Sequence, residues 1–159
     1  MPVIIDGHNL LWAIPKTSGE SGALSEIQLC RILGEYLKKS NSSGEIIFDG
    51  VGPPDKSGFD NISNLEVFFS GLGSDADTLI EDRIEVSSAP RQLIVVSSDR
   101  RLQKAARIRK AVSVKSEVFW KGLLRRLEKK KQLNEPAGKR KGLTDSETEQ
   151  WLKFFGFEQ

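Results

Sequence analysis

The sequence has almost none of the residues that build disulfides and zinc sites. Among its 159 residues are one cysteine, Cys30, and one histidine, His8. A single cysteine cannot form an internal disulfide, so we expect a protein of a reducing, cytoplasmic compartment. A zinc site is not expected, because such sites draw mainly on cysteine and histidine. No apolar run approaches the ~18 residues of a membrane span, so no membrane contact is predicted.

The rest of the composition is that of one globular domain with unevenly distributed charge. Hydrophobic residues make up 38% of the chain, which is enough for one core. Residues 1–99 carry 15 acidic and 7 basic residues, whereas residues 100–141 carry 3 acidic and 16 basic residues. A block this basic favours binding to a polyanion, although a solvated helix face is the alternative explanation.

Short apolar runs rich in β-branched residues alternate with helical patterns along the chain. Strands are predicted at residues 2–6, 45–49, 65–70, 91–99 and 111–114. Helices are predicted at residues 24–37, within 71–85, at 100–110 and at 116–131. Strands separated by helices indicate crossover connections, so we predict an α/β fold with a mostly parallel sheet.

The C-terminal part of the chain differs in composition from the rest. We predict one domain over residues 1–133, and a basic linker followed by a helix over residues 134–159. The helix is indicated by a capping pair, Thr144 and Glu147, ahead of an aromatic stretch that begins at Trp151. We expect this helix to dock on the domain or to bind a protein or ribosomal partner.

Several predicted strands are followed closely by acidic residues. Asp6, Asp49 and Asp99 each close a strand, and Asp75 and Asp77 follow another strand after a glycine-containing loop. Ligands of parallel sheets bind beyond the carboxyl ends of the strands. We therefore expect these acids to gather at one edge of the sheet.

A cluster of carboxylates needs protons or a cation to offset its repulsion. At about 4 Å and an effective dielectric constant near 20, each pair of like charges costs on the order of 4 kcal/mol. Oxygen ligands favour Mg²⁺ or Mn²⁺. Each acid also has an ordinary structural explanation: Asp6 and Asp49 precede glycines and can close turns. Ser74 with Asp77 three residues later is a capping pair for a helix, and Asp99 can cap the helix that follows it.

Three other polar residues lie near these acids in the sequence. Asn9 can fix the carboxylate of Asp6, or orient a water beside it, without adding charge. Glu81 follows Asp77 by four residues on a predicted helix, so the two share a face, although Glu81 can equally be solvated and paired with Arg83 and its neighbours. We place His8 in a loop and do not favour a catalytic role for it.

Four segments of the chain match a known family in order and spacing. They are "VIIDGHNLLW" (3–12), "IIFDG" (46–50), "DADTLIED" (75–82) and "VVSSDRRLQ" (95–103). Together they resemble the YacP-like branch of NYN domains, which belong to the PIN-like nuclease superfamily. The resemblance covers about residues 1–120, and it implies a three-layer α/β/α fold and a metal-dependent endoribonuclease of RNA processing or decay.

The resemblance also implies roles for individual residues. One or two Mg²⁺ or Mn²⁺ ions would be held by Asp6, Asp77 and Asp99. Asn9 and Asp49 become supporting members of the same catalytic site. The further candidate acids are Asp75 and Glu81.

RNA, in single-stranded form, is the expected substrate, and the basic block would contact its phosphates. The candidate RNA-binding residues are Arg100, Arg101, Lys104, Arg107, Arg125, Arg126, Lys139, Arg140 and Lys141. Phe119 and Trp120 interleave with this block and can stack on bases. We nevertheless expect both aromatic residues in the core.

Other functions share parts of this pattern. A catalytically silent RNA-binding NYN domain would keep the basic block without needing the acids. A receiver-type phospho-signalling domain also gathers acids at strand ends, but it needs two adjacent acids after the first strand, where this chain has only Asp6. A dinucleotide-binding domain is disfavoured, because no G-x-G-x-x-G follows a strand.

Overall fold

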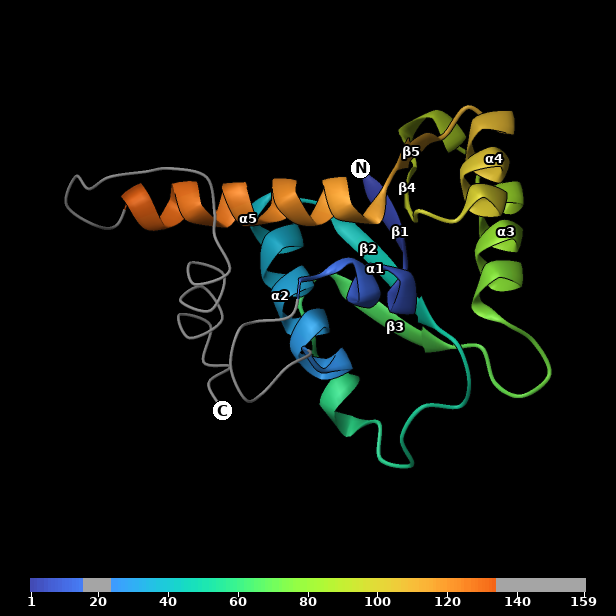
Figure 1. The fold of residues 1–159 in the computed structure, drawn as a ribbon, viewed down its shortest axis with the longest axis horizontal. Coiled ribbons are helices and arrows are strands. Elements are labelled where there is room, and N and C mark those ends of the chain that lie inside the picture. Colours follow the sequence, from blue (N-terminus) through green and yellow to red (C-terminus); the bar gives the residue numbers. More distant parts are fainter. Residues whose placement is uncertain (16–23, 134–159) are drawn as a thin grey trace.

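The centre of the computed structural model, which describes residues 1–15 and 24–133, is a sheet of five parallel strands (Figure 1). The strands are β1 (Pro2–Asp6), β2 (Ser43–Phe48), β3 (Leu65–Phe69), β4 (Ile94–Val96) and β5 (Val112–Val114). Their order across the sheet is β3-β2-β1-β4-β5, and each neighbouring pair is parallel. The prediction of an α/β fold with a parallel sheet is confirmed.

Helices cover both faces of this sheet, which gives the predicted three layers. One face carries α1 (Gly7–Ala13), α2 (Glu26–Lys39) and α5 (Ser116–Leu133). The other face carries α3 (Ala76–Val86) and α4 (Arg100–Ile108). Two short 3₁₀ turns, η1 (Ser57–Phe59) and η2 (Pro90–Gln92), lie in the connections. Figure 1 shows α3 and α4 together on one side of the strands and α2 with α5 on the other.

Two hydrophobic cores separate the layers, because successive residues of a strand point to opposite faces. Val3 and Ile5 of β1 belong to the larger core, under α1, α2 and α5. Ile4 belongs to the smaller core, under α3 and α4. Phe119 and Trp120 are buried in the larger core, as expected from the sequence.

The segment directly after β1 differs from the prediction. Residues 7–13 form α1, so His8 lies in a helix and not in a loop. Isolated helices of this length are unstable, and their stability in proteins comes from packing. Here Leu10 is fully buried and Leu11 packs against the same core. Seven residues give too short a periodic signal to be recognised in the sequence.

A glycine allows α1 to begin flush against the end of β2. A Cβ atom on Gly7 would lie 2.5 Å from Cδ1 of Phe48 and 2.9 Å from the carbonyl oxygen of Ile47. Real Cβ atoms do not come this close to such groups, so any other residue would push α1 away from the sheet. The glycine that follows Asp6 therefore has a packing role.

Two further segments were predicted with bounds that the structure either shortens or does not describe. The strand predicted at residues 91–99 is shorter, since β4 covers only Ile94–Val96, and Asp99 comes three residues after its end. The linker and helix predicted over residues 134–159 lie outside the described residues. Within the described residues, no helix combines the length and apolarity needed to cross a membrane.

We predict that Gly7→Ala lowers the free energy of unfolding by about 1–3 kcal/mol, as overpacking of a close contact does. Gly122→Ala on α5 is the matched control, because no atom lies within 4 Å of a Cβ built there. Alanine at that helical position is expected to be neutral or to stabilise by up to about 1 kcal/mol. Urea unfolding measures both changes, and equal effects would contradict the packing role of Gly7.

Candidate active site at the carboxyl edge of the sheet

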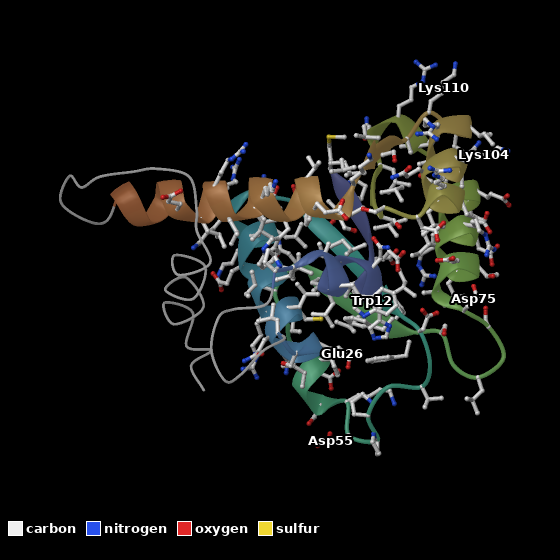
Figure 2. The ribbon with its side chains drawn as sticks, viewed as in Figure 1. Trp12, Glu26, Asp55, Asp75, Lys104 and Lys110 are labelled. Carbon is white, nitrogen blue, oxygen red and sulfur yellow. The ribbon has the colours of Figure 1, made fainter. Side chains whose placement is uncertain are left out.

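Acidic residues from several elements meet the carboxyl edge of the sheet. Asp6 is the last residue of β1, and Asp49 directly follows β2. The N-cap of α3 is Asp75 and not Ser74, as the capping pair suggested, and Asp77 lies in the first turn of that helix. Asp99 is the N-cap of α4. Because β1 lies between β2 and β4, these acids surround the end of β1. Figure 2 labels Asp75 at the start of α3.

Asp6 is the buried member of this group, with only 6% of its surface exposed. Burial raises the pKa of its carboxyl to about 6, and the neighbouring charges of Asp77, Asp49 and Asp99 raise it as well. A hydrogen bond from Ser97 acts in the opposite direction and lowers this pKa. The ionised form of Asp6 is therefore disfavoured in the folded chain.

Asp77 is electrostatically linked to the same group. Partial burial raises the pKa of its carboxyl, and the charge of Asp99 raises it further. The guanidinium of Arg101 lowers the pKa of Asp77, and the charges of Asp75 and Asp49 raise it. The carboxyls at this edge therefore lie close enough to raise one another's pKa, as expected for acids gathered there.

Three of the acids also bind the N-termini of helices. Asp49 Oδ1 accepts a hydrogen bond from the N–H of Ala76 at 2.7 Å. Asp75 Oδ1 accepts one from Thr78 N–H at 2.7 Å, and Asp99 Oδ1 accepts one from Arg101 N–H at 2.8 Å. The ordinary explanation of Asp99 as a helix cap therefore holds. Each carboxylate has a second oxygen, so capping does not prevent it from binding a ligand.

Two serines between β4 and α4, which were not predicted as site residues from the sequence, support the acids. The Ser97 hydroxyl donates to Asp6 Oδ2 at 2.9 Å and accepts from the N–H of Asp99 at 3.0 Å. Ser98 accepts from the N–H of Ser116, at the start of α5, and donates to Glu117. The pair lies in the "SSD" run that was predicted as strand. Small polar residues before an aspartate that caps a helix were the signal in the sequence that could have indicated a loop here.

Asn9 contacts this loop and α5 through its side chain. Its Oδ1 accepts hydrogen bonds from the N–H of Ser98 at 2.9 Å and from the hydroxyl of Ser116 at 2.6 Å. These bonds join α1, the loop after β4 and the start of α5. In this structure the carboxamide oxygen of Asn9 therefore positions the loop that carries Ser97 and Asp99.

Arg101 points back toward the acids. Its guanidinium donates to Glu81 Oε1 through Nε, at 2.9 Å, and also through Nη2. Its Nη1 lies 3.9 Å from Asp77 Oδ2. Glu81 is thus paired with a base, but the partner is Arg101 of α4 and not Arg83, which instead pairs with Glu45. Arg101 therefore offsets part of the negative charge of this edge.

The other candidate RNA-binding residues form two groups on opposite faces of the sheet. Arg100, Lys104 and Arg107 are exposed on α4, which begins at the acids. Figure 2 labels Lys104 on this helix. Arg125 and Arg126 are exposed on α5. The last predicted group, Lys139, Arg140 and Lys141, lies outside the described residues.

The donor chemistry of the acidic edge fits Mg²⁺ or Mn²⁺, although its side chains do not converge on one point. Among the residues that the structure describes, no three His, Cys, Asp or Glu side chains form a ready-made metal cluster. The available donors are nevertheless carboxylate oxygens, which these cations prefer. Burial and mutual repulsion disfavour the ionised forms of Asp6 and Asp77, and a bound cation would offset both effects.

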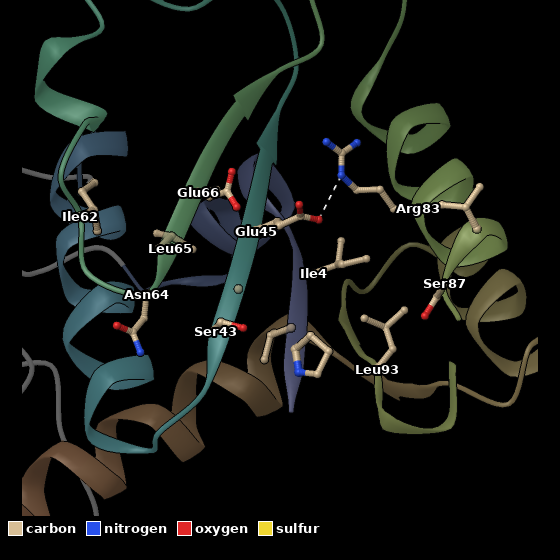
Figure 3. A pocket seen from close by; sticks show the side chains of 14 residues that line it. Ile4, Ser43, Glu45, Ile62, Asn64, Leu65, Glu66, Arg83, Ser87 and Leu93 are labelled. Carbon is tan, nitrogen blue, oxygen red and sulfur yellow. Dashed lines mark hydrogen bonds and ion pairs between the residues drawn. The ribbon is translucent and has the colours of Figure 1, made fainter. Parts of the chain in front are cut away.

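A pocket at the opposite end of the strands is not part of this site. It has a volume of about 640 Å³ and lies between α3 and the first residues of β1, β2 and β3 (Figure 3). Arg83 crosses it, donating to Glu45 Oε1 at 3.1 Å and lying 4.5 Å from the ring centre of Phe68. The acids of the carboxyl edge are not among its lining residues.

We predict that Asp6→Asn stabilises the chain in a pH-dependent way when divalent cations are removed with EDTA. Since the pKa of Asp6 is raised from 3.8 to about 6, its ionisation costs the folded state about 3 kcal/mol at pH 8. This cost is present above pH 6 and disappears as the pH falls toward 3.8. Urea unfolding at pH 8, 6 and 4 measures the gain, which should shrink at each step.

Asp55→Asn is the opposite control for that experiment. Asp55 is exposed, and hydrogen bonds from Ser57 lower the pKa of its carboxyl. Its replacement should cost stability at pH 8 and pH 6 alike and keep most of that cost at pH 4, because a carboxyl whose pKa is lowered below 3.8 loses its contribution only below that pH. A gain from Asp6→Asn that is the same at every pH would contradict the raised pKa of Asp6.

We also predict that Ser97→Ala raises the pKa of Asp6 further, because the hydroxyl that favours the ionised carboxylate is lost. The loss of stability that ionised Asp6 causes should still begin near pH 3.8, but the pH at which it levels off, which is set by the folded-state pKa of Asp6, should move upward. At pH 8 the variant should lose about 1–3 kcal/mol, since two buried groups lose a partner. Ser88→Ala, at an exposed position after α3, should change neither quantity. An unmoved pH dependence in Ser97→Ala would contradict its role.

Comparisons with known proteins agree with this fold. The structure is similar to that of Rae1 (YacP) from Bacillus subtilis, with a TM-score of 0.64, 23% sequence identity and coverage of 98% of this chain and 92% of that chain. A tryptophan-to-leucine mutant of Rae1 gives a TM-score of 0.61 and 21% identity over 86% of each chain. None of the curated proteins compared with the chain matches it.

The family model described as the YacP-like NYN domain matches residues 3–155. This match extends beyond the four segments that carried the resemblance in the sequence. NYN domains are a PIN-like nuclease family that acts on RNA, so the match supports a ribonuclease-type function in general. The chain belongs to the YacP-like NYN domain family.

Proposed function

We propose that this protein is a metal-dependent endoribonuclease that hydrolyses phosphodiester bonds in single-stranded RNA. Mg²⁺ or Mn²⁺, as one or two ions, would be held by Asp6, Asp77 and Asp99, with Asp49 as a supporting acid. The observation that carries the proposal is the electrostatic coupling of these carboxyls: Asp6 is buried, and its pKa of about 6 reflects burial and the charges of the other three. Such a group persists at neutral pH when a cation compensates it.

In this proposal some side chains position the metal-binding carboxylates, and others supply positive charge to the RNA phosphates. When bound, the cation supplies positive charge for the phosphoryl oxygens and lowers the pKa of the attacking water. Ser97 keeps the Asp6 carboxylate in place by its hydrogen bond, and Asn9 holds the loop that carries Ser97. Arg100 is exposed at the start of α4, where its guanidinium can contact a phosphate next to the cleaved bond.

A catalytically silent RNA-binding domain is the second candidate, and one observation favours it. Arg101 lies within 3.9 Å of Asp77 and is hydrogen-bonded to Glu81, so a fixed cationic group already compensates part of the acidic edge. A protein that only binds RNA would need no further cation there. The two candidates differ in whether added metal changes the fate of the RNA.

We predict that the wild-type chain cleaves a labelled single-stranded RNA in the presence of Mn²⁺ or Mg²⁺ and that EDTA abolishes the cleavage. Asp6→Asn should reduce the rate by at least about 100-fold, because the buried ligand is lost while the side chain keeps its shape. Asp60→Asn, at an exposed position after η1, is the matched control and should cleave at the wild-type rate. Gel analysis of the products measures all three rates.

Thermal unfolding gives a second readout that does not depend on finding the right RNA. Mn²⁺ should raise the unfolding temperature of the wild type, because a ligand that binds only the folded state stabilises it. The rise should be smaller for Asp6→Asn and unchanged for Asp60→Asn. RNA binding without a metal-dependent product, together with no response to Mn²⁺, would favour the silent domain.

A further inference from the structure

An exposed tryptophan stands out on the short helix that follows Asp6. Trp12, on α1, has 78% of its surface exposed. Tryptophan is highly buried on average, because its ring carries a large apolar area. Phe119 and Trp120, the aromatic residues first considered for base stacking, are by contrast buried in the core. The exposure of Trp12 leaves one face of a large aromatic ring available to a ligand.

The Trp12 ring is held in place from beneath. It stacks on His8, one helical turn earlier, with ring centres 6.1 Å apart and planes inclined by 17°. His8 Nε2 lies 2.7 Å from Oε2 of Glu26 on α2. The His8 ring also lies 5.0 Å from the ring of the buried Phe48. These contacts fix the underside of the indole, and a preorganised surface loses little entropy when a ligand binds.

This aromatic stack lies beside the acidic edge. His8 follows Asp6 by two residues, and Phe48 immediately precedes Asp49. The bridge between Gly50 and Gly71 joins the two loops that leave β2 and β3 at the same edge. Figure 2 labels Trp12 on α1 and Asp75 at the N-terminus of α3, and these helices cover opposite faces of the sheet.

We propose that Trp12, supported by His8 and Glu26, is a stacking platform for one unpaired base of the RNA substrate. The platform deepens the proposed ribonuclease function and rests on it. An indole ring can stack on the face of any base, so this contact would select single-stranded RNA without selecting a sequence. A base inside a duplex is already stacked on both faces and would not be available to Trp12.

The distribution of charge favours RNA over a protein on this surface. The acids lie next to the stack, and the exposed cations of α4, Arg100, Lys104 and Arg107, begin directly after Asp99. A strand whose phosphates follow α4 would pass the acids and bring a neighbouring base toward α1. The RNA would therefore contact α4 through its phosphates and α1 through one base.

The experiment uses the full chain carrying Asp6→Asn, so that binding is measured without cleavage, and a fluorescein-labelled 10-nucleotide single-stranded RNA. Trp12→Ala and Trp12→Leu should both weaken binding by about 5- to 150-fold, the range measured for the loss of one stacked base. Trp12→Phe should retain most of the affinity, because it keeps an aromatic face. Ile108→Ala, which removes an exposed apolar side chain at the far end of α4, should bind as the parent does.

An abasic scan of the RNA identifies the stacked base. Removing the base at one position should weaken binding of the parent chain, and it should have no further effect on Trp12→Ala. A duplex of the same sequence should bind the parent chain and Trp12→Ala equally. Parent-like affinity of Trp12→Ala for every RNA would overturn the platform. Equal affinity of Trp12→Leu and Trp12→Phe would overturn it as well, because it would indicate a general apolar patch such as a protein interface.

Failure of the platform and failure of the proposed function give different results. Metal-dependent cleavage that is unchanged by Trp12→Ala would leave the nuclease standing and remove the platform. If binding depends on Trp12 and on the presence of one base in the abasic scan, but the chain never cleaves RNA, the platform belongs to a silent RNA-binding domain.

Discussion

The buried carboxyl of Asp6 is the constraint on which the rest of this structure depends. A carboxylate at the end of a central strand loses its water, and the neighbouring Asp49 after β2, Asp77 in α3 and Asp99 before α4 add repulsion. The chain compensates only in part, with one hydroxyl from Ser97 and with Arg101 near Asp77. The folded state therefore keeps an electrostatic cost at neutral pH, which a bound cation would remove. This cost is the observation on which the proposed function rests, because strongly shifted pKa values are enriched at functional sites.

The residues that follow Asp6 build the surroundings of the site from one short helix. Gly7 permits the close approach of α1 to Phe48, Leu10 buries the helix, and Asn9 joins it to the loop after β4. The opposite face of the helix carries His8 and the exposed Trp12, whose rings stack on each other. Each named position of the Asp-Gly-x-Asn sequence thus has its own physical role. Asp6 supplies charge, Gly7 allows close packing, and Asn9 is a neutral acceptor for two donors.

The parallel sheet, the strand-end positions of Asp6 and Asp49, and the core positions of Phe119 and Trp120 could all be predicted from the sequence, because they follow from local apolar patterns. The helix α1 could not, since its seven residues are stabilised by packing on a core that only the folded chain provides. Ser97 was missed because its importance comes from Asp6, which lies 91 residues away in the chain. The pairing of Arg101 was likewise invisible, although the arginine itself was identified, because its partners Glu81 and Asp77 lie on another helix.

The sequence by itself determined the fold class, the family and the kind of chemistry available, because strand and helix periods and the order of four acidic segments are properties of the linear chain. Only the tertiary structure decided which acid is buried, which ones cap helices and which arginine faces them. These properties depend on desolvation and on distances between elements far apart in the chain, and neither is encoded in local spacing. The same reason applies to the exposed Trp12 of α1: its helix is too short for a recognisable period, and only the packing of the folded chain leaves this ring outside the core.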